Sequence, residues 1–183
     1  ALKFTIKYKG RLGPDSQDCK EMKILNRIVT WNEEGLEIEA DQRHAEIIIK
    51  DMGLNSNSAS VATPIIKPSE EKEEEDDEEE LQGQEATKFR ALTARAIYLS
   101  QDRSDIQYAT KELSRSMGTP NKRSWKAARR LARYLVGKER VVNRFKWQKA
   151  NIEDGKSWTE IKPWVDTDFA GCRRTRKSTN GGL

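Results

Sequence analysis

The chain has 183 residues, of which 35% are apolar and 35% are charged, and its formal net charge is +4. That supply of apolar residues suffices for one modest core or two small ones, and the high share of charge indicates folded segments joined by unfolded ones. No apolar run approaches the roughly 20 residues of a membrane helix, and two cysteines with a single histidine exclude a structural zinc site of the usual spacing.

The first 54 residues are predicted to form strands followed by one helix. Apolar and polar residues alternate over 4–8, which is typical of a strand. Residues 22–31 and 36–39 are separated by turn-forming residues and are predicted to pair as a β-hairpin. Asp41 is then the expected N-cap of a helix that stops at Gly53 and buries a face made of Ala45, Ile48, Ile49 and Met52.

An acidic spacer follows this first part. The periodic pattern is lost from 55 to 87, and residues 69–87 carry eleven acids and one lysine. Charge repulsion and the lack of apolar groups predict a disordered linker. One alternative is a solvated helix. Another is that the acidic run shields the basic half of the chain when no nucleic acid is bound.

Three helices with short connections are predicted next. Ser104 is the expected N-cap of the second, Pro120 opens the third, and Gly137 ends it. Short connections favour a compact antiparallel bundle over 88–137. Its apolar positions recur at helical spacing, at Phe89, Leu92, Ala96 and Leu99, then Ile106, Ala109, Leu113 and Met117, then Trp125, Ala128, Leu131 or Ala132, and Leu135.

Two further strands are expected at 141–147 and 164–169. The predicted fold class is therefore α+β, in four parts. Residues 1–54 form a hairpin and a helix, 55–87 a disordered acidic linker, 88–137 a three-helix bundle, and 138–183 the first strands of a further domain.

The third helix has the clearest electrostatic pattern. It lies in a region, 88–183, that holds 23 Lys or Arg against nine acids. Its cations recur at spacings of four, three and four residues and so share one face, with a fifth cation beside it. Such a face suits contacts to successive phosphates in sequence-independent binding, and the plain alternative is a solvated helix face. The candidate nucleic-acid-binding residues are Lys122, Lys126, Arg129, Arg130 and Arg133.

Four aromatic residues in the same region have the chemistry to stack on bases. Core packing is the better interpretation for Trp125 and Tyr134, which leaves Phe145 and Trp147. His44 lies in no arrangement of Ser, Cys or acidic residues that would form a nucleophilic site, so we assign it no chemistry.

The sequence D-T-D-F-A-G at 166–171 resembles a fragment of a catalytic centre, although D-x-D by itself is a common pattern. An Asp in a strand can present its carboxylate to Mg²⁺, and residues two apart, such as Asp166 and Asp168, point to the same face. Two-metal hydrolysis of a phosphodiester needs several such carboxylates. No further acid follows in the fifteen residues after Asp168, so the site would be incomplete.

Several motifs occur in a recognisable order. They are F-R-A-L at 89–92, I-Y-L at 97–99, R-S-D-I at 103–106, L-S-R at 113–115, W-K-A-A-R-R-L-A-R-Y-L-V-G at 125–137, D-T-D-F-A-G at 166–171 and R-K-S-T-N-G at 176–181. The last two are similar to D-A-D-W-A-G and R-K-S-T-x-G. Together the motifs resemble the region of copia-type retrotransposon Pol polyproteins that joins reverse transcriptase to ribonuclease H.

The resemblance extends more weakly upstream. The predicted hairpin and the helix after Asp41 stand where the family has its primer-contacting hairpin and first thumb helix, and Thr63–Pro64 matches a T-P that follows that helix. The acidic run is a departure from the family pattern. So are Ser104 where Pro is usual and Cys172 where Asp is usual.

The resemblance implies a fragment that holds an RNA–DNA hybrid or duplex nucleic acid through its basic bundle. It also implies a second partner, the rest of the Pol polyprotein. The family's Y-x-D-D turn is absent from the chain, and Asp166 alone matches a catalytic carboxylate of ribonuclease H, with Asp168 beside it as a second candidate ligand. The family uses Mg²⁺. We expect neither tight Mg²⁺ binding nor a complete active site in this chain, so any enzymatic activity would depend on parts outside it.

Two other functions are open from the residues. One is a non-enzymatic interaction protein that uses the acidic run and the basic bundle for protein contacts, and the other is a transposon remnant that does not fold stably. The lack of a signal peptide and the isolated cysteines, Cys19 and Cys172, predict a chain that is intracellular, cytoplasmic or nuclear, and not secreted. The two ends indicate a piece of a longer reading frame.

Overall fold

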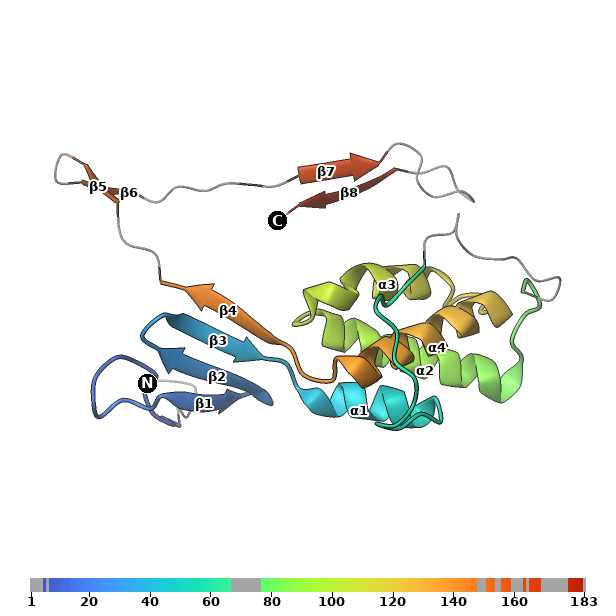
Figure 1. The fold of residues 1–183 in the computed structure, drawn as a ribbon, viewed down its shortest axis with the longest axis horizontal. Coiled ribbons are helices and arrows are strands. Elements are labelled where there is room, and N and C mark those ends of the chain that lie inside the picture. The colour runs from blue at the N-terminus through green and yellow to red at the C-terminus, as the bar shows by residue number, and fades with distance from the viewer. Residues whose placement is uncertain are drawn as a thin grey trace. The chain divides into compact units, whose positions relative to one another are not determined.

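The computed structural model describes residues 5, 7–66, 77–147, 151–153, 156–158, 163, 165–168 and 178–182. These residues belong to two compact units, 1–147 and 148–183. In the first unit, a four-stranded antiparallel sheet is joined to a bundle of four helices (Figure 1). The described part of the chain is therefore of mixed α+β type, as predicted.

The sheet has the strand order β1–β2–β3–β4, with every pair antiparallel. The strands are β1 (Glu21–Ile24), β2 (Arg27–Asn32), β3 (Gly35–Glu39) and β4 (Val142–Lys146). Gly35 lies opposite Lys146, and a Cβ at position 35 would collide with the main-chain carbonyl of Phe145. Glycine at this position therefore allows β4 to approach the hairpin.

The predicted strand at 22–31 is in fact two strands. They are joined by a two-residue turn at Leu25 and Asn26, whose φ angles of 49° and 65° are those of a type I′ hairpin turn. Asn adopts this conformation readily, whereas Leu does so at a steric cost, and so the sequence carried no clear turn signal here. The strand predicted at 4–8 is not present at Thr5 or at 7–8, and Tyr8 is exposed.

Four helices build the bundle: α1 (Gln42–Asp51), α2 (Gly83–Ser100), α3 (Ser104–Arg115) and α4 (Lys122–Gly137). The predicted N-cap of α1 is confirmed, since the Asp41 side chain accepts a hydrogen bond from the main-chain N–H of Arg43. Ser104, in contrast, is the first residue of α3, and the N-cap is Arg103.

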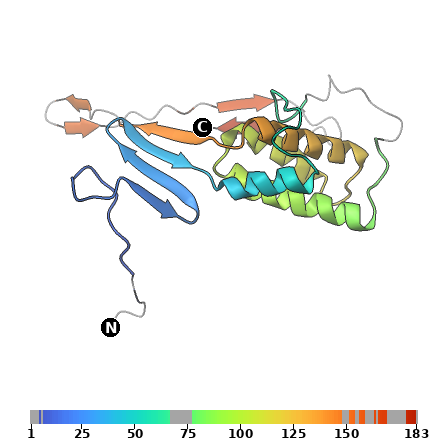
Figure 2. The same cartoon turned by 60° about the horizontal axis from the view of Figure 1, so that its bottom comes forward.

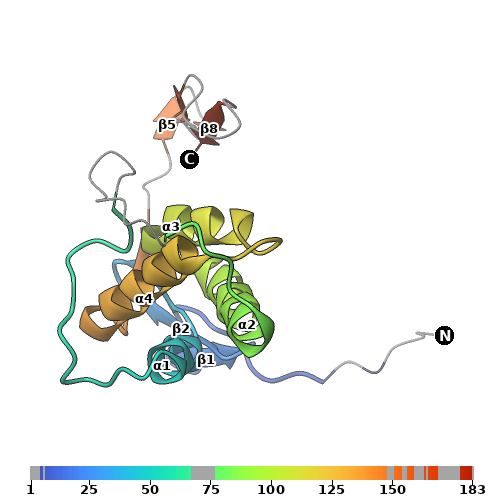
Figure 3. The same cartoon turned by 90° about the vertical axis from the view of Figure 1, so that its right-hand side faces the viewer.

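The predicted three-helix bundle contains a fourth helix, because α1 packs against both α2 and α4 (Figures 2 and 3). One continuous core holds the apolar faces of all four helices. Two residues predicted for this core, Met117 and Trp125, are only partly buried and pack against its edge. The other residues predicted from helical spacing are buried members of the core: Ala45, Ile48, Ile49 and Met52 from the α1 region, Phe89, Leu92, Ala96 and Leu99 from α2, Ile106, Ala109 and Leu113 from α3, and Ala128, Leu131, Ala132 and Leu135 from α4.

Two predicted boundaries differ from the structure. The helix predicted to begin after a linker ending at 87 begins at Gly83. The strand at 141–147 was assigned to the start of a further domain, but β4 pairs with β3 and lies in the first unit. A pairing between residues more than 100 positions apart leaves no trace in local sequence pattern, which is why the boundary was placed too early.

The sheet and the bundle are tied together by polar contacts. Arg27 Nε donates to Asp102 Oδ2 over 2.6 Å, and Asn143 Nδ2 donates to the main-chain carbonyl of Asp102 over 2.7 Å. At the C-terminal end of β3, Arg140 makes two hydrogen bonds of 2.9 Å to the buried carboxylate of Glu39. These contacts fix the strands that precede α1 and follow α4.

The second unit is described over two small antiparallel strand pairs. One joins β5 (Asn151–Glu153) to β6 (Lys156–Trp158), and the other joins β7 (Val165–Asp168) to β8 (Thr179–Gly182). The strand predicted at 164–169 is confirmed over the residues of β7.

Candidate nucleic-acid interface on helix α4

Helix α4 begins at a well-formed cap. The Asn121 side chain accepts a hydrogen bond of 3.0 Å from the Ser124 N–H, and the Ser124 hydroxyl lies 3.0 Å from the Asn121 N–H, which completes a capping box. The helix then buries Ala128, Leu131 and Leu135. Burial of this stripe leaves the predicted cations on the remaining circumference.

The N-terminal half of α4 holds carboxylates of the acidic run. Lys126 Nζ lies 2.8 Å from Asp77 Oδ1, and Lys122 Nζ lies 2.7 Å from Glu79 Oε2. Arg123, which was not among the predicted residues, lies 3.3 Å from Glu78 Oε1. Three consecutive acids therefore meet three cations of one helix face. The predicted disordered linker does not extend over these acids, which the structure places against α4.

Main-chain hydrogen bonds hold the same segment in place. The N–H groups of Lys122 and Arg123, in the first turn of α4, donate to the carbonyls of Glu79 and Asp77, each over 3.0 Å. The Leu81 N–H donates to the carbonyl of Pro120 over 2.8 Å, and the Leu81 side chain is part of the core. The first-turn amides of a helix lack partners within it and carry the positive end of its dipole, so this position suits acidic residues.

The C-terminal half of α4 is covered by the segment that follows α1. Arg133 Nε donates to the Ala59 carbonyl over 2.8 Å, and Arg130 Nη2 donates to Thr63 Oγ1 over 2.9 Å. A Cβ at Gly137 would lie 2.9 Å from Ser60 Cβ, so the segment fits closely against the helix end. These two arginines make hydrogen bonds to neutral groups, which leaves their charge uncompensated by that segment.

The five predicted cations therefore share one helix but not one environment. Lys122 and Lys126 face acids, and Arg130 and Arg133 face a neutral segment. Arg129 is exposed and makes no hydrogen bond or ion pair with the described residues. Spacing alone identified the helix face, but the segments that cross it depend on tertiary structure.

The aromatic residues divide as the sequence predicted. Tyr134 is buried and Trp125 packs against the core, whereas Phe145 is 55% exposed. Trp147 is also exposed, and its ring lies 4.3 Å from that of Trp31, centroid to centroid. Trp31 lies opposite Leu36, and Leu36 lies opposite Phe145 on the next strand. Residues opposite one another point to the same side of a sheet, so the rings of Trp31, Phe145 and Trp147 share one face. The sequence analysis missed Trp31, whose place on this face depends on strand register.

A buried charged cluster lies elsewhere in the bundle. Arg103, whose side chain is 1% exposed, donates to both carboxylate oxygens of Asp105 over 2.8 and 2.7 Å. The Tyr134 hydroxyl donates to Asp105 Oδ2 over 2.8 Å. Burial raises the pKa of Asp105, but the hydrogen bonds from Arg103 and Tyr134 outweigh it and hold that pKa below its ordinary value. The cluster links α3 to α4 and serves the fold.

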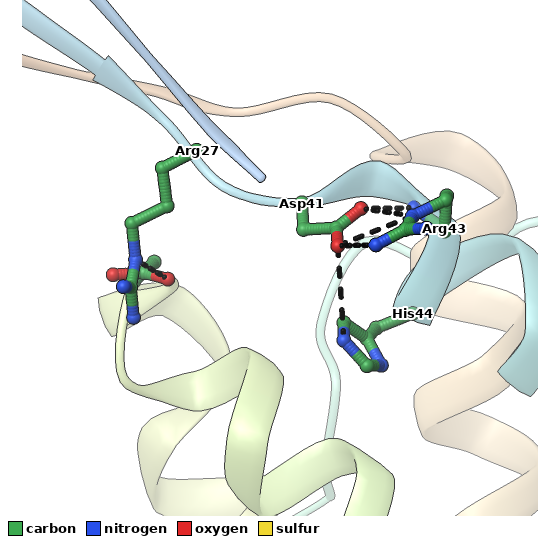
Figure 4. Close-up of polar contacts among 5 residues, drawn as sticks. Arg27, Asp41, Arg43 and His44 are labelled. Atoms are coloured by element: carbon green, nitrogen blue, oxygen red, sulfur yellow. Dashed lines mark hydrogen bonds and ion pairs between the residues drawn. The ribbon is translucent and has the colours of Figure 1, made fainter. Parts of the chain in front are cut away.

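The polar contacts around His44 are also structural. Asp41, the N-cap of α1, binds the Arg43 guanidinium through hydrogen bonds of 2.6 to 3.2 Å, which lower the pKa of the Asp41 carboxyl (Figure 4). The His44 ring lies 4.6 Å from that of Tyr98, centroid to centroid, and its Nε2 is 3.9 Å from the Asp41 carboxylate.

The candidate metal ligands Asp166 and Asp168 lie in β7, opposite Gly181 and Thr179 of β8. Their side chains are outside the described residues. Within the described part of the chain, no three His, Cys, Asp or Glu side chains gather as a metal site. The described helices include none with the length and apolar character that a membrane span requires.

Comparison with known proteins adds nothing to these observations, since no family model, no curated protein and no solved structure matches the chain.

Proposed function

We propose that this chain binds nucleic acid, as a fragment of a copia-type reverse transcriptase/ribonuclease H, and that α4 contacts the sugar-phosphate backbone of an RNA–DNA hybrid or duplex. One observation carries the proposal: α4 already holds a row of three carboxylates, at Asp77, Glu78 and Glu79. A face that binds consecutive anions of its own chain has the charge and spacing to bind consecutive phosphates.

The dimensions of the face agree with this use. From Lys122 to Arg133 the helix advances about 16 Å, at 1.5 Å per residue. Over this length Arg129, Arg130 and Arg133 lie beyond Asp77, Glu78 and Glu79, and none of the three arginines forms an ion pair with the described residues. Binding through such a face would be strongly dependent on salt and indifferent to sequence.

The remaining parts of the proposal rest on the motif resemblance. The hairpin β2–β3 and helix α1 would be the primer-contacting hairpin and the first thumb helix, and β7 would belong to the start of a ribonuclease H-like domain. Mg²⁺ would supply charge neutralisation and a polarised water to phosphodiester hydrolysis. Asp166, with Asp168 beside it, would be this chain's contribution to that site, and the other carboxylates would come from the rest of the Pol polyprotein.

A salt titration of binding tests the proposal. We would measure the affinity of the chain for a short labelled RNA–DNA hybrid between low and moderate salt, and compare it with Lys126→Glu/Arg129→Glu/Arg133→Glu. Each lost phosphate contact should flatten the log–log slope by about 0.9, the value for duplex DNA. The matched control is Lys7→Glu/Lys9→Glu/Lys23→Glu, which makes the same change of net charge on exposed residues away from α4.

An equal effect of the two triple variants would locate binding in the overall charge and would reject α4 as the interface. Salt-independent binding would instead favour the second candidate, a non-enzymatic interaction module. The observation behind that candidate is the sheet face bearing Trp31, Phe145 and Trp147, where exposed apolar side chains lie outside the core.

A further inference from the structure

We infer that the acidic segment 77–80 is a built-in competitor for nucleic acid, which occupies the α4 interface until a polyanion displaces it. The inference rests on the proposed function, because it assigns regulation to the same surface. The acidic segment binds cations and main-chain N–H groups of α4 that a phosphate backbone would also need.

The segment imitates a nucleic-acid strand in two ways. Its carboxylates pair with Lys122, Arg123 and Lys126, the cations nearest the start of the helix. Its main-chain carbonyls also accept from the first-turn N–H groups of Lys122 and Arg123. The N-terminal amides of a helix together with flanking cations form a favourable anion site, so the segment and a phosphate group would exclude each other there.

The contact is arranged so that it can be broken. The side chains of Glu78 and Glu79 are 72% and 61% exposed, and ion pairs in such positions are weak and screened by salt. Asp77 is the firmer contact, since its side chain is only 6% exposed. A polyanion that brings several charges at once replaces such pairs more easily than a single anion does.

Leu81 keeps the segment close to the helix after release. Its side chain is buried in the core, and its N–H donates to the Pro120 carbonyl, directly before α4. The carboxylates of 77–80 would then stay at high effective concentration near α4, so that they return when the nucleic acid leaves. Sequence composition reinforces the effect, because eleven acids fall within 69–87.

The test compares the affinity of three full-length chains for the same RNA–DNA hybrid at low salt. Asp77→Asn/Glu78→Gln/Glu79→Gln removes the competing charges and keeps the side-chain shapes. We expect it to bind about tenfold more tightly than the unaltered chain, the order expected when two exposed ion pairs and the firmer Asp77 contact no longer compete. The control Asp15→Asn/Glu21→Gln/Glu139→Gln makes the same change of net charge at exposed acids in the loop before β1, on β1 and after α4.

Equal affinities of the unaltered and the neutralised chain would overturn the inference and leave the proposed function intact. An equal gain in the control would do the same, since it would reduce the effect to net charge. If none of the three chains binds the hybrid at low salt, the proposed function fails and the inference fails with it. Far-ultraviolet circular dichroism of each variant establishes that the helices remain.

A second measurement follows the segment itself. On titration of the unaltered chain with the hybrid, the NMR amide signals of Glu78 and Glu79 should move toward those of an unstructured peptide, while that of Leu81 remains. If the hybrid binds and the signals of Glu78 and Glu79 stay in place, the segment is not displaced and the inference is wrong.

Discussion

Two charged clusters in the helical bundle use the same chemistry in opposite surroundings. In the buried cluster, Arg103 is enclosed and makes paired hydrogen bonds to Asp105, and Tyr134 supplies a third. In the surface cluster, Lys122 and Glu79 form one of several ion pairs that are open to water. Both clusters join α4 to another part of the chain.

The difference between them is what happens when one partner is lost. A guanidinium in the buried cluster cannot recover water, so removal of its carboxylate leaves an uncompensated charge in the core. A lysine on the α4 surface regains water or binds another anion. The first arrangement therefore holds the fold, and the second is suited to exchanging one anionic partner for another.

The largest expected effect comes from the buried cluster. Asp105→Ala should lower the free energy of unfolding by about 3 kcal/mol, because it leaves the Arg103 charge buried without its partner. Urea denaturation followed by circular dichroism measures this loss. The control is Asp51→Ala at the exposed end of α1, which should have little effect.

The dependence on pH sharpens the same prediction. The pKa of Asp105 is lower in the folded chain than its unfolded value of about 3.9. The stability that the carboxylate contributes is thus complete above that value and is lost as the pH falls through the folded pKa. The difference between the unaltered chain and Asp105→Ala should accordingly shrink at low pH, and a difference that grew would contradict the ion-pair explanation.

A smaller effect is expected from the hydroxyl of Tyr134. Tyr134→Phe keeps the ring in the core and removes one hydrogen bond to a charged group, at a cost of about 1.5 kcal/mol in the free energy of unfolding. Burial and the bond to Asp105 also raise the pKa of Tyr134, so the hydroxyl stays protonated as a donor at neutral pH. Thermal unfolding of the two chains at the same pH compares them, and equal stability would mean that the bond contributes nothing.

The apolar core of the bundle and the surface cluster differ in how far the sequence predicts them. Helical spacing identified the buried faces of α1, α2 and α4, because residues such as Phe89, Leu92 and Ala128 recur with the period of a helix. The cations of α4 followed from the same spacing. Periodicity is a local property, and it fails wherever a partner lies far away in the chain.

The contacts that define the candidate site join residues that lie far apart in the sequence. Composition predicted a disordered linker over 55–87, yet Asp77 is buried against Lys126, 49 positions later. The pairing of Leu36 with Phe145 was invisible for the same reason, and with it the aromatic face of the sheet. Charge complementarity between 69–87 and α4 was the one signal available, and it indicated attraction without specifying which residues meet.

The smallest expected effect separates the two clusters most clearly. Glu78→Gln/Glu79→Gln removes two ion pairs with exposed acids, and the free energy of unfolding should fall by less than about 1 kcal/mol in total. Urea denaturation at low salt measures the loss, and in 1 M salt, where the screening length is about 3 Å, the two chains should become equally stable. A loss above about 2 kcal/mol that persists in high salt would show that the acidic segment holds the fold as the Arg103–Asp105 cluster does. A segment bound that firmly would not yield to a polyanion, so this measurement decides whether α4 can exchange its own carboxylates for phosphates.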